Sequence, residues 1–298
     1  MKVLLTGSSG FLGKEVLKVL CKNKHTVIEF DISNGKNILN QEQIETEMKK
    51  ASCCIHLAGI VENENPALWK INVEGTKNIA HAAEKTKLKK LIFMSTTGVY
   101  GFTTREVNEK TPVTPENTYE KSKVTGEQIV LGIKSKTTVC VVRSAMIFGA
   151  NEYWKKMFKM LKKKYPLPCT GTNTFQIIYV KELAHAIVKV LEKGKNKETY
   201  LVSGKEKKTL NQFCEMVQEE LLLPKGVKHI PTFLGVFLGK ILGMKVLSMG
   251  NIRHLSKERN YEITKIEKLG YKQKITLKEA ISEVAKDLRL QEIKLEKK

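Results

Sequence analysis

Short apolar runs alternate with amphipathic stretches through the first half of the chain. The apolar runs lie near residues 2–6, 26–31, 52–58, 89–95 and 138–143, and the amphipathic stretches near 11–23, 41–50, 66–86 and 118–134. Short apolar runs bounded by polar residues predict buried strands, and apolar residues repeating at helical spacing predict helices. The alternation predicts an α/β fold with a doubly wound parallel sheet covered by helices on both faces.

The pattern changes after Gly149. Helices are predicted near 152–163, 180–191, 209–221, 231–243 and 276–288, and short strands near 174–179 and 200–203. These ranges predict a first domain over residues 1–150 and a smaller, mostly helical region over 151–298 that is partly interleaved with the sheet. The tail from Gln291 to Lys298 is expected to be frayed.

A glycine-rich turn follows the first apolar run. Gly7, Gly10 and Gly13 come directly after Val3-Leu4-Leu5-Thr6 and open an amphipathic helix that begins at Phe11. In such a turn the first glycine permits the tight bend, the second lets the backbone approach a pyrophosphate, and the third lets helix and strand pack closely. The free N–H groups at the helix start would face the phosphates. The turn therefore predicts a dinucleotide site on a Rossmann-type sheet.

An acidic residue ends the second predicted strand. Asp31 lies 18 residues beyond Gly13, where a carboxylate accepts hydrogen bonds from the adenosine ribose. A carboxylate there repels a 2′-phosphate, which favours NAD over NADP. Lys36 is close enough in the sequence to keep NADP open as an alternative.

A tyrosine and a lysine lie four residues apart on a predicted helix. Tyr119 and Lys123 would share one helix face, and an ammonium near a phenol lowers the pKa of the phenol. Such a pair can move a proton to or from a substrate hydroxyl while a hydride passes to nicotinamide. The fourth strand ends in hydroxyl residues, of which Thr96 is expected to hydrogen-bond the substrate oxygen, with Ser95 as the alternative. His56 is expected to be a packed strand residue.

The composition limits the remaining possibilities. The net charge is +21, from 31 acidic residues against five arginines and 47 lysines spread along the chain. This spread favours solvated lysine-rich surfaces over a nucleic-acid or anionic membrane surface, although the charge would suit anionic substrates. Six cysteines without metal-binding spacing, no apolar run long enough to span a membrane and no signal peptide predict a cytoplasmic protein without a metal site.

A dense apolar stripe occupies the predicted helix at 231–243. Its members are Phe233, Leu234, Val236, Phe237, Leu238, Ile241 and Leu242. The interpretation preferred here is a helix that covers the substrate pocket or contacts another subunit. A helix lying on a membrane surface is the alternative.

Several motifs together resemble the extended short-chain dehydrogenase/reductases, in particular the NAD-dependent epimerase/dehydratase family. Beyond the glycine turn and the Tyr119/Lys123 pair, the resemblance rests on residues 56–59 (His-Leu-Ala-Gly), 72–76 (Asn-Val-Glu-Gly-Thr), 95–101, 143–149, 179–184 and 268–271. It covers nearly the whole chain and implies an NAD-binding domain followed by a substrate-binding region.

The resemblance also implies roles for single residues. Thr96, Tyr119 and Lys123 match the catalytic residues, and Tyr119 and Lys123 would also contact the cofactor. The other implied cofactor contacts are Gly7, Gly10, Phe11, Leu12, Gly13, Asp31, Asn37, Ile38, Leu57, Ala58 and Gly59. A homodimer is expected by analogy with the family.

Departures from the family pattern narrow the activity. Thr97 and Gly98 stand where 4,6-dehydratases carry an Asp-Glu pair, which argues against water elimination. Phe175-Gln176 replace a phosphate-binding arginine, so Arg253 or Arg259 would have to contact a diphosphate. The sequence thus predicts an oxidoreductase resembling nucleotide-sugar 4-epimerases. A reductase of a lipophilic alcohol or ketone, resembling dihydroflavonol reductases and 3β-hydroxysteroid dehydrogenases, and a non-catalytic assembly subunit remain alternatives.

Overall fold

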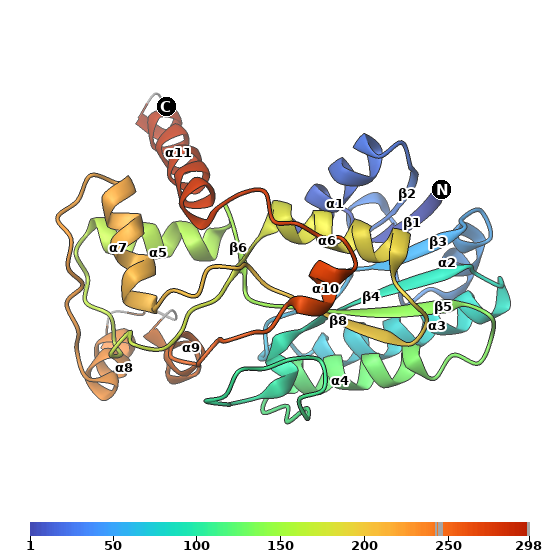
Figure 1. Ribbon diagram of the computed structural model, residues 1–298, viewed down its shortest axis with the longest axis horizontal. Helices are drawn as coiled ribbons and strands as arrows, with labels where there is room; N and C mark the ends of the chain where they lie inside the picture. Colours follow the sequence, from blue (N-terminus) through green and yellow to red (C-terminus); the bar gives the residue numbers. More distant parts are fainter. Residues whose placement is uncertain (242, 244–246, 297–298) are drawn as a thin grey trace.

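A parallel sheet of six strands forms the larger part of the molecule. The computed structural model describes residues 1–241, 243 and 247–296. The strand order is β2-β1-β3-β4-β5-β8, with every neighbouring pair parallel. The strands are β1 (Lys2–Thr6), β2 (Thr26–Phe30), β3 (Cys53–His56), β4 (Lys90–Thr96), β5 (Thr138–Ser144) and β8 (Glu198–Val202). The predicted doubly wound fold is confirmed, and Figure 1 shows the sheet in the right half of the molecule.

Helices cover both faces of this sheet. On one face lie α1 (Phe11–Lys22) and α6 (Val180–Lys193), and on the other lie α2 (Gln41–Met48), α3 (Gly75–Lys85) and α4 (Thr118–Leu131). Alternate residues of β1 face opposite sides, so Val3 and Leu5 pack toward α1 while Leu4 packs toward α2 and α3. Strands buried on both faces explain the nearly continuous apolar runs in the sequence.

The predicted helix at 66–86 is the main discrepancy in this half. Residues Lys70–Glu74 form a π-helical turn, η2, which runs directly into α3. Single π-helical turns are often found at functional sites, and this one places Asn72 toward the sheet edge.

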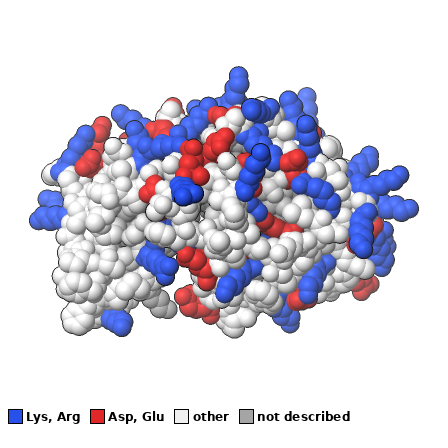
Figure 2. Space-filling view, turned by 60° about the horizontal axis from the view of Figure 1, so that its bottom comes forward, with Lys and Arg blue, Asp and Glu red and all other residues white. Residues whose placement is uncertain are grey.

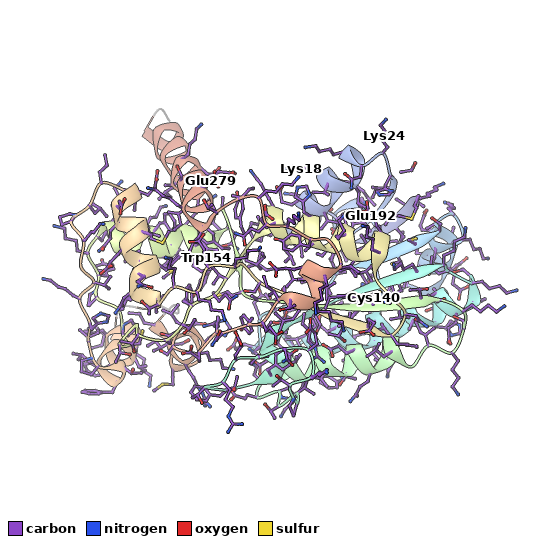
Figure 3. All side chains as sticks on the ribbon, viewed as in Figure 1. Lys18, Lys24, Cys140, Trp154, Glu192 and Glu279 are labelled. Atoms are coloured by element: carbon purple, nitrogen blue, oxygen red, sulfur yellow. The ribbon has the colours of Figure 1, made fainter. Side chains whose placement is uncertain are left out.

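Most of the remaining helices form a second region beside the carboxyl edge of the sheet (Figure 1). They are α5 (Glu152–Lys162), α7 (Leu210–Glu220), α8 (Thr232–Ile241), α9 (Met249–Leu255) and α11 (Leu277–Glu296). The short helix α10 (Thr264–Lys268) instead packs against β8 of the main sheet. A small parallel pair, β6 (Ile147–Phe148) and β7 (Ile178–Tyr179), joins this region to the sheet. An aromatic cluster of Phe148, Trp154, Phe175 and Phe213 forms its core, and Figure 3 labels Trp154 on α5.

Some elements from β6 onward differ from those predicted from the sequence. β6, α9 and α10 were not predicted, and α11 continues to Glu296 instead of ending near residue 288, so the expectation of fraying from Gln291 was wrong as far as Glu296. Leu242 of the predicted apolar stripe lies outside the described residues. β8, which follows α6 in the chain, adds to the main sheet beside β5.

Three further observations concern the whole described chain. No helix in the described residues has both the length and the apolar character needed to cross a bilayer. All six cysteines are free thiols. Within the same residues no three His, Cys, Asp or Glu side chains gather where they could hold a metal ion.

Candidate active site at the carboxyl edge of the sheet

The glycine turn between β1 and α1 is held by contacts that leave no room for side chains. Gly7 has a φ of +71°, and a Cβ on it would lie 2.8 Å from the backbone nitrogen of Ala58. A Cβ on Gly13 would overlap the carbonyl oxygen of Gly7. The backbone of β1, the start of α1 and the loop after β3 therefore approach one another as closely as a pyrophosphate site requires.

The start of α1 also offers free hydrogen-bond donors. Its N-cap is Gly10, and no side chain caps the helix. The hydroxyl of Ser8, in the middle of the turn, is buried and has no hydrogen-bond partner in the described structure. Uncapped N–H groups and an unpaired hydroxyl suit a bound anionic group, so the residues present fit the diphosphate of a dinucleotide.

Asp31 lies directly beside this turn. Its carboxylate accepts hydrogen bonds from the backbone N–H of Ser9 (3.2 Å) and of Ser33 (3.0 Å). Partial burial alone would raise the pKa of Asp31, but the hydrogen bonds from Ser9 and Ser33 outweigh it, and the net pKa lies below the usual value. Asp31 therefore remains an anion that can accept hydrogen bonds from ribose hydroxyls.

The structure also shows where Lys36, Asn37 and Ile38 lie. The Lys36 ammonium is 2.6 Å from a Glu47 carboxylate oxygen, so the residue that kept NADP open as a cofactor is already paired. The Asn37 carboxamide oxygen accepts the backbone N–H of Leu39, and Ile38 is buried against Gly75. An adenine contact by Asn37 or Ile38 remains a prediction.

The loop Leu57–Gly59 after β3 is supported by His56. Its imidazole is buried, with Nδ1 2.7 Å from the Thr6 hydroxyl and Nε2 3.1 Å from the Thr76 hydroxyl. Burial, with a contribution from Lys123, lowers the pKa of His56 to about 3. The histidine is thus a neutral packing residue, as the sequence analysis expected, and not a base.

Tyr119 and Lys123 lie on the first turns of α4, which is capped by the side chain of Asn117. The Lys123 ammonium is 5.9 Å from the centre of the Tyr119 ring and donates to the carbonyl of Met94 on β4 at 3.1 Å. A Cβ on Gly59 would lie 3.4 Å from that ammonium. Lys123 therefore connects Tyr119, β4 and the loop after β3 at one point of the sheet edge.

The hydroxyls at the end of β4 have separate roles. Ser95 is buried and donates to Glu127, which also forms a two-pronged ion pair with Arg143. Thr96 is partly exposed at the sheet edge, where its hydroxyl oxygen accepts the backbone N–H of Gly98 at 3.0 Å. Because Ser95 is occupied inside the protein, Thr96 is the hydroxyl available to a substrate.

The pKa of Tyr119 differs from the expectation. Burial raises the pKa of Tyr119 above its usual value, and the neighbouring carboxylate of Glu120 adds to the rise. Burial also lowers the pKa of Lys123 to about 8, although Glu127 partly opposes this. The expectation that the lysine lowers the tyrosine pKa was therefore wrong for the described chain, because burial and Glu120 outweigh an ammonium several ångströms from the ring.

Asn72 is a site residue that the sequence analysis quoted without assigning it a role. Its carboxamide accepts the N–H of Ile60 (2.8 Å) and donates to the carbonyl of Ile60 (2.9 Å) and to the hydroxyl of Ser122 (3.0 Å). Ser122 in turn donates to the carbonyl of Tyr119. Asn72 thus connects the loop after β3 to the helix that carries Tyr119. The sequence analysis predicted an ordinary helix here and did not identify the π-helical turn that positions Asn72.

A buried ion pair joins the second region to the same helix. The Lys257 ammonium lies 3.3 Å from Glu120 and 3.1 Å from Glu116. The other Glu120 oxygen accepts the backbone N–H groups of Glu116 and Asn117. No local pattern indicated this link, because Lys257 is far from Glu116 and Glu120 in the chain and belongs to no motif.

The two arginines expected to contact a diphosphate lie in different surroundings. Arg259 is buried, donates to the carbonyls of Lys257 and His254, and lies over the ring of Phe175. Two of its five N–H groups therefore have partners inside the protein. Arg253 is exposed and lies 3.7 Å from Glu116.

These features define a class of protein: a Rossmann-fold oxidoreductase with a glycine-rich turn, an acidic residue after the second strand and a tyrosine–lysine pair at one sheet edge. Residues 3–203 match the NAD dependent epimerase/dehydratase family, and the chain belongs to that family. The expected cofactor and enzyme class are thereby confirmed as those of an NAD-dependent enzyme of the epimerase/dehydratase type.

Three similar proteins illustrate the range of its relatives. N-acetyl-alpha-D-glucosaminyl-diphospho-ditrans,octacis-undecaprenol 4-epimerase of Escherichia coli O157:H7 is 24% identical over 313 residues, covering 94% of this chain and 92% of the relative. Sterol-4-alpha-carboxylate 3-dehydrogenase (decarboxylating) of Dictyostelium discoideum is 25% identical over 325 residues, covering 95% and 99%. The crystal structure of a UDP-glucose 4-epimerase from Thermotoga maritima has a TM-score of 0.82 at 21% identity, covering 98% and 99%, and supports the fold.

Proposed function

We propose that this chain is an NAD-dependent 4-epimerase that oxidises and re-reduces one secondary hydroxyl of a sugar carried on a diphosphate. The observation that carries the proposal is the meeting of Tyr119, Lys123 and Thr96 with the glycine turn and the Gly59 loop at one sheet edge. Acid–base and dinucleotide-binding groups are then adjacent, as hydride transfer requires.

The cofactor contacts follow from the same geometry. The turn Gly7–Gly13 and the Ser8 hydroxyl would hold the diphosphate, Asp31 the adenosine ribose, and Lys123 with the 57–59 loop the nicotinamide ribose. Bound NAD supplies the hydride acceptor, and the positive charge of its oxidised ring favours the phenolate form of a nearby tyrosine.

The chain's own residues handle the proton. Tyr119 takes the proton from the substrate hydroxyl as the carbinol carbon loses hydride, and returns it when hydride adds to the opposite face of the ketone. Thr96 donates a hydrogen bond that orients the substrate oxygen. Since the hydride returns to the same carbon, the reaction needs no net oxidant.

The diphosphate-linked sugar is supported by what two relatives have in common. The Escherichia coli relative acts on a sugar joined by a diphosphate to a polyprenol, and the Thermotoga maritima structure contains UDP-glucose. A net charge of +21 suits such an anionic substrate.

A second candidate is a dehydrogenase or reductase of a lipophilic alcohol or ketone. It is favoured by an apolar pocket in the second region, by the absence of an arginine at Phe175-Gln176, and by the sterol dehydrogenase relative. A non-catalytic assembly subunit is disfavoured because Tyr119, Lys123 and Thr96 are all retained.

The test is Tyr119→Phe. Turnover of UDP-glucose, UDP-N-acetylglucosamine and polyprenyl-diphospho-N-acetylglucosamine should fall by about 10²–10⁴-fold on the best substrate, since that is the usual contribution of a general acid–base group. NAD affinity by calorimetry should not change. Tyr200→Phe is the control, because the Tyr200 hydroxyl only accepts the N–H of Lys195 before β8. Unchanged turnover in Tyr119→Phe would refute the proposal.

The cellular setting is part of the proposal. A cytoplasmic protein is supported by six free cysteines, and a homodimer through α3 and α4 is supported by the packing of these helices side by side on one sheet face. Light scattering after gel filtration would measure the mass, and a monomer would contradict the dimer.

A further inference from the structure

Helix α8 packs through its glycines. Gly235 and Gly239 are its buried residues. A Cβ on Gly235 would overlap Pro168, and one on Gly239 would lie 2.5 Å from the Leu247 side chain. Glycine weakens a helix by about 1 kcal/mol relative to alanine, so two glycines four residues apart indicate that close packing is needed on this face.

The opposite face of the helix carries large apolar side chains in solvent. Phe233, Phe237 and Ile241, spaced four residues apart, are 73%, 58% and 63% exposed, and we call them the α8 face. Met249 of α9 is also exposed. Burying one such side chain contributes about 1.5–3 kcal/mol, so a helix that points its glycines inward and its phenylalanines outward is arranged to contact something apolar outside the chain.

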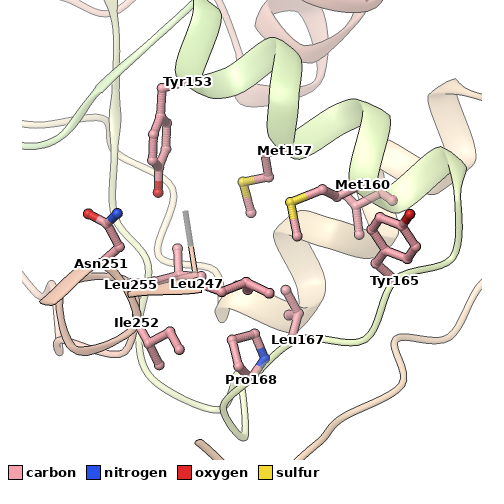
Figure 4. Close-up of a pocket in the computed structure, with 11 residues that line it drawn as sticks. Tyr153, Met157, Met160, Tyr165, Leu167, Pro168, Leu247, Asn251, Ile252 and Leu255 are labelled. Atoms are coloured by element: carbon pink, nitrogen blue, oxygen red, sulfur yellow. The ribbon is translucent and has the colours of Figure 1, made fainter. Parts of the chain in front are cut away.

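An apolar pocket lies directly behind this helix. Pro168 and Leu247, against which the α8 glycines pack, are both part of its lining. Figure 4 shows Met157 and Met160 of α5 facing them across the opening. The cavity volume is only about 40 Å³, and Asn251 is the one side chain of its lining without a large apolar part.

Basic residues dominate the two segments from which the pocket lining comes. Residues 153–181 and 221–257 contain no aspartate or glutamate and carry thirteen basic residues: Lys155, Lys156, Lys159, Lys162, Lys163, Lys164, Lys181, Lys225, Lys228, Lys240, Lys245, Arg253 and Lys257. Five of these, Lys155, Lys181, Lys225, Arg253 and Lys257, form ion pairs with acidic residues of other segments, so an excess of positive charge remains but is smaller than the count. Figure 2 shows a broad uncharged area at the left end of the molecule with Lys and Arg around it.

We propose that the α8 face lies in the surface of an anionic membrane. Exposed aromatic and aliphatic side chains surrounded by basic residues bind interfaces through both apolar burial and attraction to anionic headgroups. A second copy of this chain fits less well, since it would bring two surfaces with an excess of basic residues against each other.

The pocket also connects to the active site through the chain. Leu255 lines the pocket, and Lys257, two residues later, holds Glu120 beside Tyr119. Membrane binding at the α8 face does not depend on the proposed function.

The experiment is vesicle co-sedimentation of the full chain. Wild type should bind phosphatidylcholine vesicles containing phosphatidylglycerol and bind pure phosphatidylcholine vesicles more weakly. Phe233→Ser/Phe237→Ser should lower the partition coefficient about tenfold or more for each phenylalanine removed, with an unchanged melting temperature because both side chains are exposed. Leu222→Ser is the matched control, since Leu222 is exposed just beyond α7, outside the α8 face.

A second measurement separates insertion from charge attraction. Phe237→Trp should show blue-shifted emission and quenching by brominated lipids on the same vesicles, and Leu222→Trp should not. No binding by the wild type, binding that the double serine variant retains, or a dimer that this variant dissociates would each overturn the proposal. None of these measurements uses turnover, so failure of the proposed function would leave their outcome unaffected.

Discussion

The two ends of the molecule use glycine for opposite purposes. At the carboxyl edge of the sheet, Gly7 and Gly13 bring backbone against backbone, and the large apolar side chains around them are buried. In α8, Gly235 and Gly239 bring the helix onto Pro168 and Leu247, and the large apolar side chains are left outside.

The two regions also differ in whether their exposed or polar groups have partners within the chain. At the sheet edge Glu127, His56 and Asn72 have their hydrogen-bond partners inside the chain. The α8 face has no covering element among the described residues. The cofactor end is therefore fixed by internal contacts, whereas the other end is shaped for a partner that the chain does not contain.

The largest expected effect concerns two arginine–glutamate pairs, of which Arg143–Glu127 is buried and Arg253–Glu116 is more exposed. Arg143→Leu leaves Glu127 buried without its countercharge and should lower the free energy of unfolding by about 3–5 kcal/mol. Arg253→Leu removes an arginine that is 66% exposed and should cost at most about 1 kcal/mol. Urea denaturation measures the free energy of unfolding of both variants. Equal losses would remove the contrast between the buried and the exposed pair.

A glycine pair tests how closely the cofactor turn is packed. Gly7 and Gly35 have similar φ values, +71° and +78°, but only Gly7 has neighbours within 4 Å of a new Cβ. Gly35→Ala should cost about 1–2 kcal/mol through backbone strain alone, and Gly7→Ala about 1–3 kcal/mol more, with loss of NAD binding by calorimetry. If the two variants are equally stable, the turn can relax and the close approach is not required.

Lys257→Met tests the link between the ends. It removes a charged partner of buried Glu120 and should cost about 1.5–3 kcal/mol. Burial would raise the pKa of Glu116, but Lys257 and Arg253 outweigh it and lower that pKa.

The sign of the pH dependence follows from this lowered pKa. The stabilisation by Glu116 is present above the usual glutamate pKa and is lost as the pH falls through the lower value of the folded state. Between about pH 5 and pH 3 the free energy of unfolding, measured by denaturation, should therefore fall less steeply with decreasing pH in Lys257→Met than in wild type. An unchanged slope would show that Lys257 does not set the pKa of Glu116.

The smallest effect is expected at the α8 face. Phe237→Ser should change the free energy of unfolding by no more than about 0.5 kcal/mol, because the ring is already in solvent. Phe213→Ala, in the buried aromatic cluster, is the reference and should cost about 3–5 kcal/mol. A large loss in Phe237→Ser would mean that its ring packs inside the protein in solution.

The sequence predicted the sheet well because its strands are buried on both faces. Such strands appear as uninterrupted apolar runs, and all six were placed to within a few residues. The short elements β6, α9 and α10 were missed, since two to seven residues are too few to show a period. The π-helical turn around Asn72 was read as ordinary helix for the same reason.

The site was predictable where it depends on backbone geometry. The glycine turn, Asp31 and the Tyr119/Lys123 spacing are local patterns, and the structure brings them to one edge. The rise in the pKa of Tyr119 and the Lys257–Glu120 pair depend on burial and on contacts between distant segments, which no local pattern contains. The outward orientation of Phe233 and Phe237 likewise depends on the packing of Gly235 against Pro168 and of Gly239 against Leu247, which are contacts between separate segments.

The hydrogen bonds around His56 have a direction. Thr76 gives its proton to the carbonyl of Asn72, so it must accept from Nε2, and Nδ1 of the neutral ring must accept from Thr6, whose oxygen receives the N–H of Ala58. One tautomer is therefore fixed from pH 5 upward, and nitrogen NMR of that ring would report whether the Leu57–Gly59 loop is intact. Acidification within the physiological range cannot switch this support, because the imidazole has no proton to gain there.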